Sequence, residues 1–529
     1  MRTAFHSLLI VLICGFFCVT VLAQCPGRPV PGTVVGDAWS LSSTNGELHA
    51  DFIMGRSVDK YGYTHYCYNY NTGSRYVEAP TLRLNPGDTL ILGIKNHIEG
   101  SDSQGMKMKM APPPGPICGD SGPINVESTN VHFHGLNVPP VCHQDDVINT
   151  LIEPNTPGFE FKMKIPKDEP PGLYWYHPHI HGFTEFQVNG GAAGALIVNG
   201  IEKYRPEVAG LTERVFTIRQ QYLVPWIPGP YQLSLNYEVA AFPNSPSPII
   251  QMKPGEKQFW RVANATIQDF LQLQVLTNDT AEQLELIALD GYPLDKPRMQ
   301  TSILIPPASR AEFIVTAPTT GNGTFLTENY STGPTGNPDL EQALANIELT
   351  NNPANPDPDA APIKEPASPA PANPPSIKFA DLSTAPITAK RKIYFSEEFG
   401  GTNGPIQFYI TVEGQKQRVF EADEKPVITT KVGAVEEWTV ENRALETHAF
   451  HIHQIHFKVI EIDGKPVADQ DLRDTIEIPF WEGPGTSYHS VKMLMDFRDP
   501  TIAGTFVFHC HILLHEDLGM MHKILVEPN

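Results

Sequence analysis

Short runs of apolar and aromatic residues alternate with polar positions along most of the chain, and Gly, Pro and Asn residues separate them. The pattern begins near Cys25, continues to about Asn199, and resumes after residue 210 and again after residue 390. A period of two residues with frequent turn residues is typical of β-sandwiches and barrels, and the helical period is almost absent. We therefore predict an all-β fold and exclude a helix-rich one.

Two internal repeats divide this pattern into three units. In each unit a Gly opens one strand and an Asn follows nine residues later, and a second similar phrase closes the unit at residues 172–177, 323–328 and 504–509. The pairs are Gly87 and Asn96, Gly255 and Asn264, and Gly433 and Asn442. Such repetition predicts three related β-domains. We place them at residues 24–205, 206–350 and 386–529, with the Pro-rich residues 351–385 as a linker.

Length and charge narrow the possible functions. A chain of 529 residues is too long for one ordinary core and suggests about three domains of roughly 150 residues each. The formal net charge of -21 argues against nucleic acid as a partner. Small neutral or cationic substrates suit this charge better.

The N-terminus has the pattern of an export signal. The basic start Met1-Arg2 precedes an apolar run from Leu8 to Leu22 and a small residue, Ala23, at the expected cleavage site. We predict a signal peptide at residues 1–23 and a secreted or periplasmic protein with no membrane span after its removal. An uncleaved anchor is disfavoured because the run is short and lacks a charged stop, and Gln24 is a poor residue to precede a lipid-modified cysteine.

Five of the seven cysteines lie beyond the predicted signal peptide. Export to an oxidising compartment makes two disulfides plausible among the four early ones, Cys25, Cys67, Cys118 and Cys142. Pairing Cys25 with Cys67 and Cys118 with Cys142 is one possible connectivity, and the sequence leaves the choice open. Cys510 is then an odd thiol, free to bind metal.

The histidines are confined to the first and third units. The chain has 19 of them, and none lies between His181 and His448. After the closing strand the first unit carries His177-Pro178-His179 and the third carries His509-Cys510-His511, whereas the second has neither an imidazole nor a thiol. We infer that the first and third units build a metal site together and that the second is a spacer that sets their geometry.

Four His-x-His phrases supply the imidazoles of this site. Side chains two apart on an extended strand share a face, so each phrase offers two imidazoles to one side. By the same parity Cys510 points away from its two neighbours, and His448 is out of phase with the phrase that follows it. With His515 and Met520 they form the ligand set of a blue-copper centre. The four pairs are His132 and His134, His177 and His179, His451 and His453, and His509 and His511.

In these phrases, their order and their spacing, the chain resembles the multicopper oxidases, which include laccases, bilirubin oxidases and bacterial cuprous oxidases. The resemblance covers nearly the whole mature chain. It implies three tandem cupredoxin-like Greek-key domains, four copper ions, and a trinuclear cluster that reduces dioxygen to water. By position it implies that type 1 copper is bound by His448, Cys510, His515 and Met520, type 2 copper by His132 and His451, and the type 3 pair by His134, His177, His179, His453, His509 and His511.

Two positions depart from patterns common in that family. Phe133 stands where many members have Trp, which alters packing more than ligation. Met520 occupies the axial place that high-potential fungal laccases fill with a non-coordinating residue, so the resemblance implies a lower potential.

Dioxygen reduction consumes protons, so carboxylates are expected near the cluster. Glu516 follows a type 1 ligand and is expected to alternate back toward the cluster, and Asp145 follows the first His phrase, with Asp146 as an equal alternative. Both resemble the proton-relay acids of the family. The other interpretation is that they are solvated loop charges.

We predict a secreted, monomeric oxidase that takes electrons singly from a reducing substrate and passes them to dioxygen, with phenols and aromatic amines as the leading donors. A metallo-oxidase acting on Cu(I) or Mn(II) is the alternative enzyme. The thioethers of Met106, Met108 and Met110 suit Cu(I), although incidental methionines on a strand or loop are the favoured interpretation. A copper protein that transfers electrons without turnover is the alternative outside enzymes.

Overall fold

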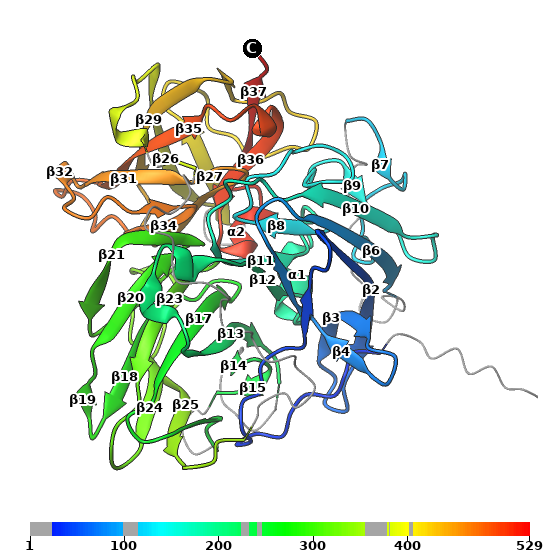
Figure 1. Cartoon of the computed structure of the whole chain (residues 1–529). Helices are drawn as coiled ribbons and strands as arrows, with labels where there is room; N and C mark the ends of the chain where they lie inside the picture. The colour runs from blue at the N-terminus through cyan, green and yellow to red at the C-terminus, as the bar shows by residue number, and fades with distance from the viewer. Residues whose placement is uncertain are drawn as a thin grey trace, which may run out of the picture.

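A computed structural model describes residues 24–98, 115–223, 232–240, 246–354, 378–379, 381–400 and 406–529. These residues form three pairs of β-sheets, so the predicted all-β fold class is confirmed. Figure 1 shows the first unit in blue and cyan, the second in green and the third in yellow to red, with β36 and α2 beside β8 near the centre. The predicted signal peptide and the Met106–Met110 stretch lie outside the described residues.

The first unit consists of two five-stranded sheets and a short strand pair. Phe52, Leu92 and Phe133 lie among the apolar side chains that fill its core. One sheet has the order β1 (Ser40–Ser42), β5 (Thr81–Leu84), β12 (Gly194–Val198), β11 (Gly172–His177) and β8 (His132–His134). The other has the order β10 (Phe159–Lys164), β6 (Thr89–His97), β2 (Glu47–Val58), β3 (Thr64–Asn71) and β4 (Tyr76–Glu78), and β7 (Cys118–Gly119) pairs with β9 (Thr150–Leu151).

The second unit packs a seven-stranded sheet on a six-stranded one. Val35, from the start of the described chain, also enters its core. The first sheet has the order β15 (Glu238–Val239), β14 (Gln232–Leu235), β13 (Thr212–Gln221), β17 (Lys257–Ala265), β23 (Arg310–Thr316), β20 (Leu284–Leu289) and β21 (Tyr292–Gln300). The second has the order β16 (Ile249–Met252), β25 (Gln342–Leu349), β24 (Gly323–Glu328), β18 (Leu271–Thr277) and β19 (Thr280–Ala281), with β22 (Ile303–Ile305) on β18.

The third unit contains the C-terminal strands. Trp438, Phe450 and Phe508 are buried in its core, which also receives Phe270 from the second unit. One sheet has the order β27 (Ile406–Val412), β26 (Ala389–Phe399), β29 (Ala434–Asn442), β35 (His489–Phe497), β31 (Phe457–Ile462) and β32 (Lys465–Pro466), with β33 (Leu472–Arg473) on β31. The other has the order β28 (Ile428–Lys431), β37 (Met521–Glu527), β36 (Gly504–Cys510), β30 (His448–Ile452) and β34 (Thr475–Ile478). The domain boundaries drawn from the sequence remain predictions.

The repeated Asn has the same structural task in each unit. The amide of Asn96 donates to the carbonyl oxygens of Glu127 and Ile152 at 2.7 Å each, and its own oxygen accepts from the N–H two residues later. Asn264 and Asn442 make the same three kinds of bond. A buried side chain therefore joins the end of one strand to a neighbouring segment, because buried backbone oxygens need a donor.

Helices are few and short among the described residues. The two α-helices, α1 (Thr184–Asn189) and α2 (Leu513–Asp517), come from the first and third units, and Asp517 joins them. Its carboxylate accepts the N–H groups of Gly182, Thr184 and Glu185 at 3.0, 3.1 and 2.9 Å. The 3₁₀ turns are η2 (Ile201–Lys203), η3 (Pro206–Val208), η4 (Leu382–Thr384) and η6 (Pro500–Ile502). In the part of the chain that is described, no helix has both the length and the apolar character needed to cross a membrane.

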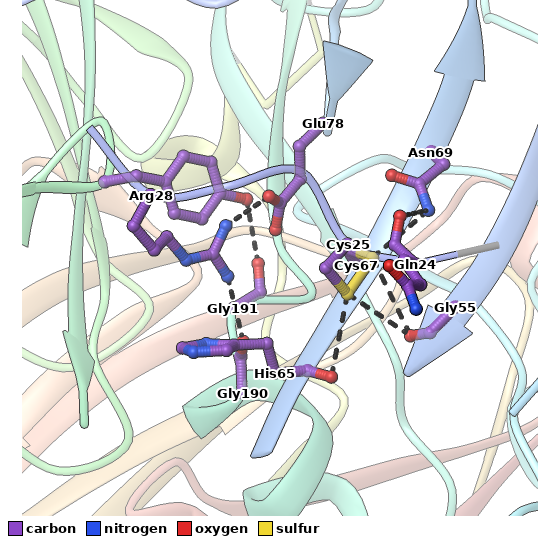
Figure 2. Close-up of a disulfide and its surroundings, with 11 residues drawn as sticks. Gln24, Cys25, Arg28, Gly55, His65, Cys67, Asn69, Glu78, Gly190 and Gly191 are labelled. Carbon is purple, nitrogen blue, oxygen red and sulfur yellow. Dashed lines mark hydrogen bonds and ion pairs between the residues drawn. A yellow bond between two sulfur atoms is a disulfide. The ribbon is translucent and has the colours of Figure 1, made fainter. Parts of the chain in front are cut away.

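Two disulfides form, Cys25–Cys67 and Cys118–Cys142, which confirms one of the pairings left open by the sequence. Figure 2 shows that the first ties the N-terminal segment to β3, with Arg28 beside it pairing with Glu78 and reaching the carbonyl of Gly190. Cys510 is a buried free thiol, as predicted.

Candidate metal centres

Two strand pairs bring the imidazoles together. In the first unit β11 lies antiparallel to β8, with His177 opposite His132. In the third unit β30 lies antiparallel to β36, with His451 opposite His509. All eight imidazoles of the four His-x-His phrases are buried, and contacts between the two units bring their rings face to face, as in the stacking of His134 on His451 at 4.0 Å. The predicted cluster between the first and third units therefore exists as a geometric feature.

The ring nitrogens converge in three trios, in each of which one nitrogen per residue lies within 4.8 Å of the others. In one trio Nε2 of His509 lies 3.4 Å from Nε2 of His179 and 3.2 Å from Nε2 of His453. Burial lowers the pKa of His177 to about 3 and that of His451 to about 4, so the imidazoles are neutral and able to ligate. The trios are His132, His134 and His451; His134, His177 and His511; and His179, His453 and His509.

Several of these rings are held by one nitrogen and leave the other without a protein partner. Nδ1 of His177 donates to the carbonyl of Pro178 at 2.8 Å, and Nδ1 of His451 donates to the carbonyl of Asp474 at 2.8 Å. Nε2 of both rings is buried and has no hydrogen-bond partner. His134 is turned the other way, because its Nε2 faces Asp474 at 3.2 Å and its Nδ1 is unpartnered. This arrangement fixes the tautomer and is how proteins prepare histidines for metal ions, so the residues fit copper.

The thiol belongs to a separate group. Sγ of Cys510 lies 3.5 Å from Nδ1 of His448 and 3.9 Å from Nδ1 of His515. Met520 is fully buried in the same core, and its carbonyl accepts the N–H of Cys510 at 3.1 Å. Burial raises the pKa of the Cys510 thiol, so the metal-free protein holds a neutral thiol that metal binding would deprotonate.

The predicted acids take different positions. Asp145 lies 3.0 Å from Nδ1 of His132, and burial raises its pKa to about 7. Asp146 instead accepts from Asn149 at 3.0 Å, so Asp145 is the one at the cluster. Glu516 lies 3.2 Å from Nδ1 of His509, and burial, together with Asp517, raises its pKa well above the usual value. Glu516 reaches the cluster because it lies in the helical turn α2, and not through the strand alternation expected from the sequence.

Four further groups were not expected from the sequence. Asp474 lies against His134 and pairs with Arg310 of the second unit. Burial opposes ionisation of Asp474, but the Arg310 guanidinium outweighs it and holds the pKa of Asp474 below its usual range. Glu397 lies 3.3 Å from Nε2 of His448, and Glu446 lies 3.6 Å from Nε2 of His515. Their only signal in the sequence is a charged residue within or beside an apolar strand.

Four further histidines lie outside both groups. His143 is exposed and stacks on Phe159 at 4.7 Å. His456 bonds the carbonyl of Asp290 at 2.8 Å. His181 and His522 pack against Phe420 and Glu424, respectively.

Sequence models of one family match most of the chain. Three models, each described as multicopper oxidase, match residues 124–203, 175–351 and 400–529. The chain belongs to the multicopper oxidase family. Members of this family are copper-dependent oxidases that use dioxygen, and the two ligand groups described above agree with that chemistry.

Known multicopper oxidases resemble most of the chain at low identity. The multicopper oxidase mco of Staphylococcus haemolyticus is 25% identical over 467 residues, covering 85% of this chain and 82% of its own. A laccase of Haloferax volcanii is 25% identical, covering 77% of this chain and 69% of its own. Among solved structures, a metallo-oxidase of Campylobacter jejuni has a TM-score of 0.66 at 23% identity, covering 94% of this chain and 96% of its own. McoA of Aquifex aeolicus has a TM-score of 0.68 at 17% identity, with 94% and 100% covered.

Proposed function

We propose that this multicopper oxidase holds four copper ions in the two groups of ligands. The observation that carries the proposal is the convergence of buried, neutral ring nitrogens that lack protein partners. In this assignment type 1 copper is bound by His448, Cys510, His515 and Met520, type 2 copper by His132 and His451, and the type 3 pair by the trios His134, His177, His511 and His179, His453, His509.

The chain joins the two groups through a single residue. Cys510 lies between His509 and His511 in sequence, at the end of β36, so a short through-bond path along the backbone runs from the thiol to two imidazoles of the cluster. Copper bound at these sites supplies one-electron redox chemistry and the reduction of dioxygen to water. The protein around the cluster keeps water away from the ring nitrogens, and the position of Cys510 keeps the electron path short.

Protons for this reaction have two candidate donors. Glu516 contacts His509 and His179, whereas Asp145 contacts His132 and also accepts from the amide of Gln454 at 2.5 Å. Acids with a raised pKa hold a proton near neutral pH and can release it locally. We assign both to proton delivery.

Phenols and aromatic amines are the first choice of donor. They release a proton when they lose an electron, and the outer nitrogen of His448 faces the carboxylate of Glu397, which can accept it. We further propose that the protein is exported and works as a monomer.

A metal-ion donor is the second candidate, and a small acidic pocket favours it. Asp339 and Glu446 line this pocket together with Phe270 and Ile512, next to His515. Oxygen ligands suit Mn(II) better than the soft Cu(I) ion. Burial, with Asp269 nearby, raises the pKa of Asp339 to about 9, and burial raises that of Glu446 to about 8. A cation must displace these protons, so oxidation of Mn(II) should accelerate as the pH rises toward 8.

Oxygen uptake by the purified protein tests these proposals. The donor panel is a phenol, an aromatic amine, bilirubin, Cu(I) and Mn(II), and visible absorption records the blue thiolate band. In Glu446→Gln and Asp339→Asn we expect oxygen uptake with phenol to continue and oxidation of Mn(II) to be lost. This pair of results would support both classes of donor. Blue colour without uptake for any donor would refute the oxidase proposal and leave an electron-transfer protein.

A further inference from the structure

Arg310 lies at a junction of all three units. It begins β23 in the second unit and is completely buried. Its Nε donates to the carbonyl of Leu173 in the first unit at 3.1 Å, and Nη1 donates to the carbonyl of Ala308 in its own unit at 3.2 Å. The same guanidinium donates two hydrogen bonds to the carboxylate of Asp474 in the third unit, from Nη1 at 2.8 Å and from Nη2 at 2.6 Å.

Asp474 connects Arg310 to the imidazole cluster. Its Oδ1 lies 3.2 Å from Nε2 of His134, and the hydroxyl of Thr475 donates to the same oxygen at 2.9 Å. Its main-chain carbonyl accepts from Nδ1 of His451 at 2.8 Å. A carboxylate paired with a guanidinium only accepts hydrogen bonds, so Nε2 of His134 carries the proton and Nδ1 is left for the cluster.

Gly135 shows that the backbone makes room for this pair. It follows His134 directly and has a φ of +88°, a conformation that favours glycine. A Cβ at this position would lie 2.5 Å from Nη2 of Arg310 and 2.7 Å from Oδ2 of Asp474. The turn after the first His phrase is therefore packed against the ion pair.

We propose that Arg310, a positioning residue that contacts no metal ligand, holds Asp474 so that its carboxylate fixes the ring orientation of His134 and thereby strengthens copper binding by the cluster. The second unit is then more than a spacer, because its side chain sets the tautomer of a ligand carried by the first unit. The inference rests on the proposed ligand role of His134. Carboxylates that hold ligating histidines typically contribute about 10- to 100-fold to metal affinity.

The test compares two identical substitutions on neighbouring strands. Arg310→Lys replaces the guanidinium by an ammonium group, which cannot donate the two parallel hydrogen bonds to the carboxylate of Asp474. Arg261→Lys is the matched control, because Arg261 on β17 is also buried and pairs with Glu213 and Glu312, with no imidazole contact among the described residues. Residues Ala263 and Arg310 are opposite each other in this strand pair, so both variants perturb the same sheet.

The readout is copper retention, measured by copper content and by electron paramagnetic resonance during titration with a chelator. The blue thiolate band serves as an internal reference for the Cys510 group. We expect Arg310→Lys to release cluster copper at about 10- to 100-fold lower chelator concentration while the blue band is retained, and Arg261→Lys to release it as the wild type does. Thermal unfolding of the copper-free proteins measures general destabilisation in both.

The outcomes separate this inference from the proposed function. Equal release profiles for Arg310→Lys and Arg261→Lys, with a normal wild-type profile, would overturn the positioning role alone. A wild type that holds copper only at the thiolate would overturn the proposed cluster, and the inference with it. Asp474→Asn, which removes the carboxylate charge from the other end of the pair, is measured in the same way and should show the same loss; if Arg310→Lys does not fold, this variant decides.

Discussion

Replacing Glu516 by Gln would remove one acidic proton beside the imidazole cluster and alter little else. The two side chains have nearly the same volume, so the substitution leaves no cavity in a position that is fully buried. The carboxylate lies 3.2 Å from Nδ1 of His509 and 3.5 Å from Nε2 of His179. A loss of activity would therefore report on the proton and not on packing.

The expected magnitude follows from the role proposed for the acid. A positioned general acid contributes about 10²- to 10⁴-fold to a rate, which corresponds to about 2.7–5.5 kcal/mol of barrier at about 1.36 kcal/mol per tenfold. We expect kcat for dioxygen reduction with Glu516→Gln to fall by this factor. The rate of the variant should not depend on titration at this position, because the amide cannot titrate.

Stability should change in the opposite direction. Burial raises the pKa of Glu516 in the folded protein, whereas the unfolded chain releases this proton near the ordinary value of about 4.3. Between those two pKa values the folded state binds more protons than the unfolded state, so the wild type loses stability as the pH rises. Gln does not titrate, so above about pH 5 the variant should be at least as stable as the wild type in thermal unfolding.

Stopped-flow absorption separates the two half-reactions. Anaerobic mixing with a phenol should bleach the blue band of Glu516→Gln at the wild-type rate, whereas dioxygen should restore the colour of the reduced variant about 10²- to 10⁴-fold more slowly. Glu477→Gln is the control, since Glu477 on β34 is another carboxyl whose pKa burial raises. A wild-type rate of reoxidation in Glu516→Gln, or an equal loss in Glu477→Gln, would refute the reasoning.

Three further predictions concern the sulfur atoms. Cys510→Ser should abolish the blue colour and oxygen uptake while far-ultraviolet circular dichroism is unchanged; retained colour or activity would contradict the thiolate assignment. Met520→Leu should raise the type 1 potential in redox titration at a cost below about 1.5 kcal/mol, because the side chains have similar volumes; an unchanged potential would show that the thioether is not axial. Replacing Cys118 and Cys142, 24 residues apart, by Ala should lower the free energy of unfolding by about 3.4 kcal/mol through loop entropy, and a loss below about 1 kcal/mol in denaturant titration would contradict this.

Strand periodicity was sufficient to predict which side chains share a face. His132 and His134 turn to the same cluster, and Cys510 leaves the face of its neighbours to meet His448 and His515, because side chains alternate on extended backbone. The approach of His515 and Glu516 could not be derived in this way. That segment forms α2, where successive side chains are about 100° apart, so adjacent residues reach the thiol group and the cluster, respectively.

The contacts that could not be predicted join residues far apart in the chain. Asp474 and His134 are separated by 340 positions, and Arg310 and Asp474 by 164. A His-x-His phrase indicates a metal site by its composition alone. A single Asp or Arg in an apolar strand has many possible partners, so its contact cannot be predicted. The choice between Asp145 and Asp146 was open for a related reason, since only the fold shows which of two adjacent carboxylates meets His132.

The second unit contributes to both ends of the electron path although it supplies no ligand. At the cluster, Arg310 holds Asp474 against His134. At the thiol group, Asp339 lines the pocket beside Glu446, and its carboxylate accepts the N–H of Phe270, whose ring enters the core of the third unit. Because these contacts act on residues of the third unit, a change in the packing of the second unit should alter donor access and cluster geometry together. Counting histidines alone would assign this unit no part in the chemistry, yet Asp339 and the buried Arg310 position groups on both sides.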